Sequence, residues 1–218
     1  MEILTLTLQT KDLMGTKKFY QDILGFQKLA ESEKHLVFQV GSSSLIFELV
    51  EESNAPKYHF AFNIPINKMD EAISWAIQKV DLLENDKKET IIHFENWKAK
   101  AIYFFDTNRN IVELICREDL NYTTDSAFSA ESIFNISEIG LVVDYPLQTS
   151  AEIIEKTNTC FFDKGPKRED FAALGTDAGL FVISNPHRNW YPTKDRAEKH
   201  KVRAKIKVKE EIFELEFH

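Results

Sequence analysis

The sequence has few cysteines, no long apolar run and no surplus of basic residues. Its 218 residues include only two cysteines, Cys116 and Cys160, each in an apolar stretch. We therefore expect reduced thiols within the core rather than a disulfide framework. No apolar run reaches the ~18 residues that a membrane span requires, and no cationic stretch followed by an apolar one opens the chain. The sequence thus predicts a cytoplasmic protein without a membrane partner.

The charge balance is acidic, with 35 Asp and Glu residues against 27 Lys and Arg residues and a net charge of −8. Nucleic-acid binding relies on clustered basic side chains that neutralise phosphates. We therefore exclude a general nucleic-acid partner. One basic stretch, residues 199–205, alternates charged and apolar side chains, which is typical of a strand with one solvated face.

The first 52 residues predict one strand, one helix and three further strands. Residues 4–8 alternate apolar and polar side chains, as a half-buried strand does. Asp12 suits the N-cap of a helix that Gly25 ends. Three strand patterns follow at residues 26–30, 36–40 and 44–50. The order is βαβββ.

The same order recurs in residues 56–117, with a strand at 58–64, a helix at 69–80 and strands at 91–94, 99–105 and 110–116. Residues 118–135 are polar and predict a linker. Residues 136–218 predict a third, divergent βαβββ module with two extra strands, at 201–208 and 212–217. We therefore predict an α+β fold in which repeated βαβββ modules, the first two paired, form a curled mixed sheet around a cleft.

Short motifs recur in order within the first two modules. They are Asp12, Phe19-Tyr20, Leu24-Gly25-Phe26 and Phe47-Glu48-Leu49, then His59, Tyr103-Phe104, Asp106, Asn110 and Ile111-Val112-Glu113-Leu114. As a set they resemble the vicinal oxygen chelate superfamily, which includes glyoxalases, bleomycin-resistance proteins and extradiol dioxygenases. The resemblance covers residues 3–117 well and residues 136–184 more loosely.

The resemblance implies metal ligands on the first and last strands of each module. The corresponding positions carry Thr5, Glu48, His59 and Glu113. Strand alternation places each Glu between apolar neighbours, where an ionised carboxylate is costly unless it is paired or binds metal. We therefore expect Glu48, His59 and Glu113 to hold a divalent ion such as Zn, Fe, Ni or Mn.

Threonine is a poor ligand for these ions, so the position of Thr5 departs from the pattern. One His with two Glu also differs from the two His and one carboxylate of iron dioxygenases. The set lies nearer to the glyoxalase and epimerase arrangement, in which Glu113 would be a catalytic base or a displaceable ligand.

Four further side chains are expected to line the cleft: His93, Trp97, Tyr103 and Phe105. Their aromatic rings suit a flat apolar ligand, and core packing is the alternative. Arg188 with Trp190-Tyr191-Pro192 reads either as a rim or lid of the cleft or as the anchor of an irregular loop.

Two functions remain open at this point. The first is a metal-dependent lyase, isomerase or dioxygenase acting on a small oxygenated molecule. The second is a metal-free protein that binds or sequesters a small molecule, as bleomycin-resistance proteins do. Both predict a small-molecule ligand, and a homodimer is compatible with either.

Overall fold

The computed structural model describes residues 1–51 and 55–218, and it confirms the α+β class. The module boundary expected at residue 52 lies outside the described residues. Within those residues, none of the helices combines the length and the apolar character that crossing a bilayer requires. Cys116 is buried as predicted, whereas the prediction is wrong for Cys160, which is exposed.

The elements follow the predicted order closely. The first unit comprises β1 (Glu2–Thr10), α1 (Leu13–Lys17) continued by a π-helical turn (Lys18–Ile23), β2 (Lys28–Glu31), β3 (His35–Val40) and β4 (Ser43–Leu49). Asp12 caps α1 because its Oδ1 accepts a hydrogen bond from the Gly15 N–H at 2.8 Å. Gly25 ends the helical segment with a φ of +85°, a conformation that favours glycine.

The second and third units repeat the pattern. The second holds β5 (His59–Asn63), α2 (Met69–Ala76), β6 (Ile92–Phe94), β7 (Ala99–Phe105) and β8 (Ile111–Arg117). The third holds β9 (Asn135–Val142), α3 (Pro146–Thr157), β10 (Lys167–Arg168), β11 (Phe171–Thr176) and β12 (Gly179–Ser184). The strands β13 (Val202–Val208) and β14 (Glu211–Phe217) close the chain, and short 3-10 turns span Glu95–Trp97, Glu118–Leu120 and Ala130–Ser132.

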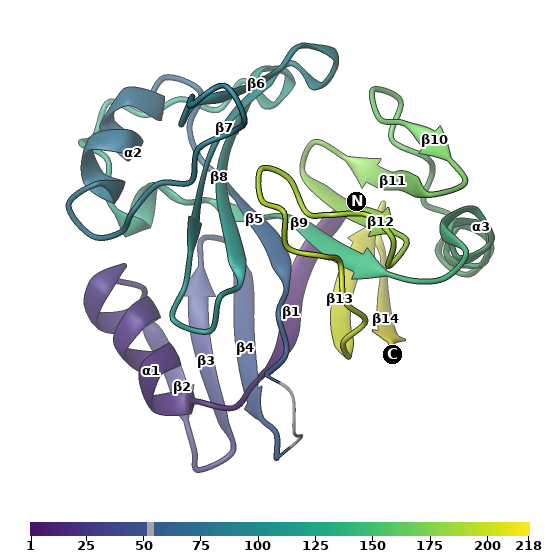
Figure 1. Cartoon of the computed structure of the whole chain (residues 1–218), viewed down its shortest axis with the longest axis horizontal. Coiled ribbons are helices and arrows are strands. Elements are labelled where there is room, and N and C mark those ends of the chain that lie inside the picture. The colour runs from purple at the N-terminus through teal and green to yellow at the C-terminus, as the bar shows by residue number, and fades with distance from the viewer. Residues whose placement is uncertain (52–54) are drawn as a thin grey trace.

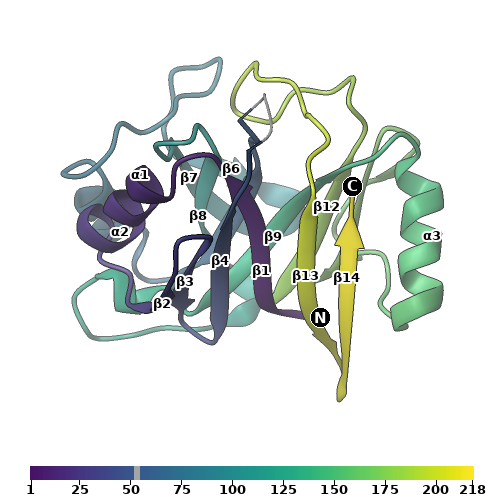
Figure 2. The ribbon, with the colours of Figure 1, turned by 90° about the horizontal axis from the view of Figure 1, so that it is seen from below.

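Within each unit the first and last strands pair in parallel, as β1 with β4, β5 with β8 and β9 with β12. A single mixed sheet contains all three units, with β9 between β1 and β5 (Figure 1). β5 pairs antiparallel with β9, and β1 pairs antiparallel with β13, beside which β14 lies (Figure 2).

β5 is buried on both faces, and its alternation separates two clusters of side chains. Phe60 and Phe62 join the main core, which also holds the buried residues of the helices. Ala61 joins a smaller cluster on the opposite face, with Tyr103 and Trp190. The face that carries His59 and Ala61 is therefore the one that lies away from the main core.

A buried hydrogen bond joins the first unit to the second. The Tyr20 hydroxyl donates to Asp106 Oδ2 at 2.8 Å, and burial raises the pKa of both groups. Asp106 also accepts from the backbone N–H groups of Asn108 and Asn110, at 2.9 and 2.8 Å. The turn between β7 and β8 is thereby fixed against the helical segment of the first unit.

We predict that Tyr20→Phe lowers the free energy of unfolding by about 1–3 kcal/mol, because the buried Asp106 loses one of its donors. Urea denaturation measures the change. The matched variant Tyr145→Phe removes a hydroxyl from a side chain that is 70% exposed, and it should stay within about 0.5 kcal/mol of the wild type. Equal stabilities for the two variants would contradict a stabilising role of the Tyr20–Asp106 hydrogen bond.

Candidate functional site

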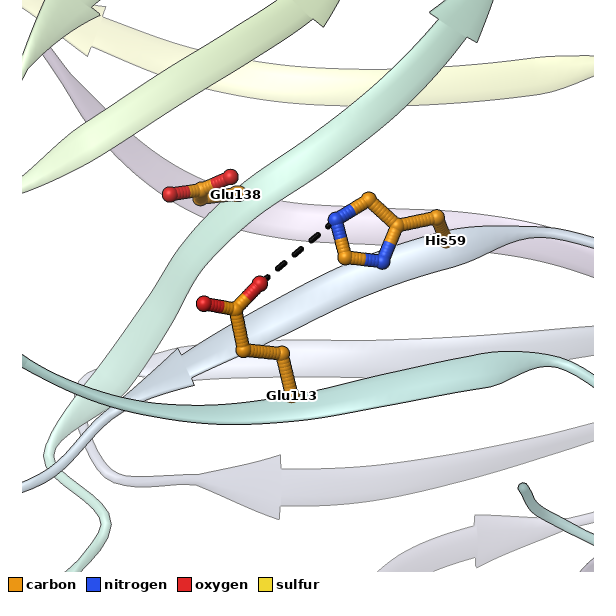
Figure 3. Close-up of side chains that lie close together, drawn as sticks. All are labelled: His59, Glu113 and Glu138. Carbon is orange, nitrogen blue, oxygen red and sulfur yellow. Dashed lines mark ion pairs between the residues drawn. The ribbon is translucent and has the colours of Figure 1, made fainter. Parts of the chain in front are cut away.

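Three ionisable side chains meet on the face of the sheet opposite the main core. Ala61 of β5 pairs with Glu113 of β8 on one side and with Glu138 of β9 on the other, so both carboxylates flank the same residue. His59 lies two residues before Ala61 and shares its face. One ligand-type atom from each of the three side chains lies within 4.8 Å of the others (Figure 3). Their exposed fractions are 6% for His59, 2% for Glu113 and 4% for Glu138.

A β-bulge and a buried arginine set the position of Glu138. The register between β5 and β9 shifts by one residue, which leaves Ser137 without a partner across the ladder. Arg117, fully buried, donates through Nε to Ser137 Oγ at 3.1 Å and through Nη2 to Glu138. Bulges often redirect side chains in this way. Arg117 therefore binds both residues of the bulge and balances one of the two buried carboxylates.

His59 is held as a neutral ligand-type imidazole. Its Nδ1 lies 3.2 Å from the carbonyl oxygen of Ile111, which only accepts, so Nδ1 carries the proton. Nε2 is then unprotonated and lies 3.5 Å from Glu113 Oε2. Burial lowers the pKa of His59 to about 4. At neutral pH the contact with Glu113 is therefore not an ion pair, and the lone pair of Nε2 points into the site.

The two carboxyl groups resist ionisation. Burial raises the pKa of Glu113 well above its usual value, and the charge of Glu138 raises it further. Burial also raises the pKa of Glu138, against the opposing effect of Arg117. Tyr103 lies opposite Glu113 in the β7–β8 ladder, and burial and the charge of Glu113 raise the pKa of Tyr103. Two carboxyls thus share one hollow with a single buried cation, an arrangement that favours a shared proton or an added cation.

A cavity of about 240 Å³ opens above the three side chains. Aromatic rings are prominent in its wall, which also includes Arg188, whose side chain is 33% exposed. The lining residues are His59, Phe94, Trp97, Tyr103, Glu113, Ile115, Glu138, Pro166, Phe171, Val182, Ser184, Arg188, Asn189, Trp190 and Tyr191. This volume is smaller than that of pockets for drug-sized ligands, which begin at about 300 Å³.

The irregular segment 185–199 closes one side of the cavity. Its Trp190 ring lies 5.1 Å from the His59 ring, centroid to centroid. Gly140 of β9 makes room for that indole, because a Cβ at this position would lie 2.7 Å from Trp190 Cη2. The segment is fixed to the second unit, since the Arg109 guanidinium pairs with Asp195 at 3.0 Å. The sequence allowed this segment to be either a rim or lid of the cleft or the anchor of a loop. Its placement agrees with a rim of the cavity.

A family model for the glyoxalase/bleomycin resistance protein/dioxygenase superfamily matches residues 2–114. The chain belongs to this superfamily. The metallothiol transferase FosB of Staphylococcus haemolyticus is 32% identical over 117 residues, which cover 50% of this chain and 78% of that protein. FosB of Staphylococcus epidermidis is 31% identical over the same length and shares.

Among solved structures, a Bacillus subtilis protein provisionally named a dioxygenase superposes with a TM-score of 0.61 at 15% identity. The superposition covers 84% of this chain and 63% of that protein. At this identity the likeness concerns the fold alone. The family match itself ends at residue 114, so Glu138 lies beyond it.

The superfamily pattern predicted Glu48 as a ligand, but the structure does not bring Glu48 together with His59 and Glu113. Glu48 has a side chain 40% exposed and forms an ion pair with Arg203 of β13. Thr5 lies in a separate surface hollow beside Arg203 and Lys205. The ligand-type group of the described residues takes Glu138 in place of Glu48.

Of the four predicted cleft residues, Trp97 and Tyr103 line the cavity. His93 is exposed on β6 and belongs to a neighbouring surface hollow. Phe105 is half-buried, with the Arg109 guanidinium 4.1 Å from its ring centre. Neither His93 nor Phe105 is therefore part of the wall of this cavity.

Sequence reasoning missed Glu138 and Arg117. The signal for Glu138 was present, because the superfamily places ligands on first and last strands. Within the predicted strand 136–143, Glu138 is the ionisable side chain nearest the strand's start. The last strand of the third unit contributes the apolar Val182, which pairs with Gly140. Nothing in the local pattern around Arg117 signalled its role, which depends on the bulge in β9.

We predict that Glu113→Gln stabilises the metal-free protein increasingly as pH rises. A carboxyl whose folded pKa is raised contributes stability below its unfolded pKa, near 4.5, and loses it as pH climbs through the folded pKa. The variant cannot ionise and avoids this loss. Thermal unfolding in chelator between pH 5 and 9 measures the difference, at about 2–4 °C per kcal/mol. A difference independent of pH would mean that Glu113 titrates normally.

Proposed function

We propose that the protein is a metal-dependent enzyme acting on a small oxygen-bearing organic molecule, with His59, Glu113 and Glu138 as ligands. The observation that carries the proposal is the juxtaposition of these three buried side chains beneath one cavity. This donor set of nitrogen and carboxylate oxygen suits Zn, Mn, Fe or Ni.

The surroundings of His59 support a ligand role. Ligating histidines usually donate their second ring N–H to a carbonyl or carboxylate, which orients the ring. His59 meets this requirement through Ile111, and its low pKa keeps Nε2 free of a proton at neutral pH. Arg117 pairs with only one of the two carboxylates, so a divalent cation would offset the charge that remains on Glu113.

When bound, a divalent cation polarises a carbonyl or hydroxyl oxygen of the substrate and so acidifies the adjacent C–H or O–H. The residues of the chain then divide the remaining work. Glu113, as a displaceable ligand, would accept and return the proton. Glu138 would stay in place as a ligand because Arg117 and the bulge anchor it. Tyr103 holds Glu113 in place, while Trp190 and Trp97 cover the site and limit its contact with water.

The second candidate, a metal-free binding protein, rests on a different observation. Arg117 already pairs with Glu138. The last strand of the third unit, β12, carries the apolar Val182 where a fourth ligand would be expected. In that case the cavity would bind an apolar molecule and would not catalyse a reaction. A cytoplasmic location and a homodimer are further proposals from the sequence, and light scattering of the purified protein tests the homodimer.

We predict that the purified protein binds Mn²⁺ or Zn²⁺ with one site per chain after reconstitution. His59→Gln, Glu113→Gln and Glu138→Gln should each weaken binding at least about 100-fold, since even residues that only support a ligand cost 10–100-fold when mutated. Isothermal titration calorimetry at pH 7.5 measures the affinity.

Glu48→Gln is the matched control, because it makes the same change at the ligand position expected from the sequence. It should bind metal as the wild type does. Weakened binding in Glu48→Gln with unchanged binding in Glu138→Gln would restore the ligand set read from the sequence. The absence of metal binding by the wild type at millimolar ion would favour the binding protein.

A further inference from the structure

The residues that line the cavity differ in burial and chemistry. His59, Glu113 and Glu138 are buried, Arg188 has a side chain that is 33% exposed, and Tyr191 is 47% exposed. Most of the other lining residues are aromatic or apolar. The volume of about 240 Å³ lies below the roughly 300 Å³ at which pockets for drug-sized ligands begin. A ligand that fills it is therefore small.

Arg188 carries the positive charge of this wall: among the described residues that line the cavity, it is the one Lys or Arg side chain. Its position is fixed. Its backbone N–H donates to the Asn185 carbonyl at 3.3 Å, and its carbonyl accepts from the Ala197 N–H at 2.9 Å. Its guanidinium lies 4.9 Å from the centre of the Phe171 ring.

The guanidinium of Arg188 keeps donor capacity. Its Nη1 donates to Asp170 Oδ2 at 2.6 Å, whereas a guanidinium offers five N–H donors in all. The side chain is one-third exposed, at 33%. An arginine anchored in this way on one side presents its other edge as a preformed fork for a planar anion.

We propose that Arg188 selects the ligand of this cavity, which is a small aromatic or flat apolar acid whose anionic group binds at Arg188. This inference rests on the proposed function for the other end of the ligand, whose oxygen-bearing group faces His59 and Glu113. Among the described residues that line the cavity, Arg188 is the one Lys or Arg, so the charged end of the ligand lies beside it.

The test compares phenylacetate with phenylacetamide, a neutral probe of nearly the same size and shape. Trp97 and Trp190 line the cavity, so the quenching of tryptophan fluorescence reports binding. We expect the wild type to bind phenylacetate about 10- to 100-fold more tightly than phenylacetamide, the range that a hydrogen bond to a charged group gives. In Arg188→Gln this preference disappears, while the affinity for phenylacetamide stays within about threefold.

Arg168→Gln is the matched control. Arg168 also lies near Phe171 and pairs with Asp170 at 3.4 Å, but it does not line the cavity. It should keep the preference for the acid. An equal loss in both variants would show a general effect of charge and overturn the assignment, as would a lack of saturable phenylacetate binding by the wild type.

Titration of the same samples with Zn²⁺ separates this inference from the proposed function. Arg188→Gln should bind Zn²⁺ as the wild type does, because Arg188 does not belong to the ligand-type group. Loss of the acid preference with Zn²⁺ binding intact supports the role of Arg188. A wild type that binds phenylacetate selectively but no Zn²⁺ keeps Arg188 as the selecting residue and removes the metal enzyme.

Discussion

Two carboxylates buried in one hollow with a single buried cation form the constraint on which the site depends. Glu113 and Glu138 are 2% and 4% exposed, and of these two carboxylates Arg117 donates a hydrogen bond to Glu138. Such a cluster is unfavourable for folding unless a proton or a cation occupies it. Its position at the base of a cavity indicates that the cluster serves ligand binding or chemistry. If only packing mattered, apolar side chains would fill this space at a lower cost in free energy.

The sheet creates this hollow by placing β9 beside β5. Because the first strands of the second and third units are direct neighbours, residues on one face of β5, β8 and β9 converge. The first unit takes another partner, since β1 pairs with β13. There Arg203 of β13 faces Glu48, so a side chain of the chain itself balances that carboxylate. The carboxylate of Glu48 is thus balanced by an ion pair within the chain. Among the described residues, Glu113 has no Lys or Arg paired with it.

Local pattern was sufficient for most of the fold and for part of the site. Strict alternation located β1 and β13, and the Asp12 cap and Gly25 bounded the first helix, because these signals depend on near neighbours in the chain. The same alternation placed Glu113 inward. Glu48 was misjudged because its partner Arg203 lies 155 residues away. Glu138 was missed because the order of strands between units, and the bulge at Ser137, are tertiary features that no local pattern records.

In the proposed function the two carboxylates take different roles because their neighbours differ. Arg117 donates to Glu138 at the bulge, whereas Glu113 lies 3.5 Å from Nε2 of His59 and opposite Tyr103 in the β7–β8 ladder. Two similar groups in different environments are suited to different tasks, here an anchored ligand and a proton carrier. Arg188 adds a positive charge to the lining of the same cavity. The proposed ligand would place its anionic group at Arg188 and its oxygen-bearing group at His59 and Glu113, and it would therefore bind in one orientation.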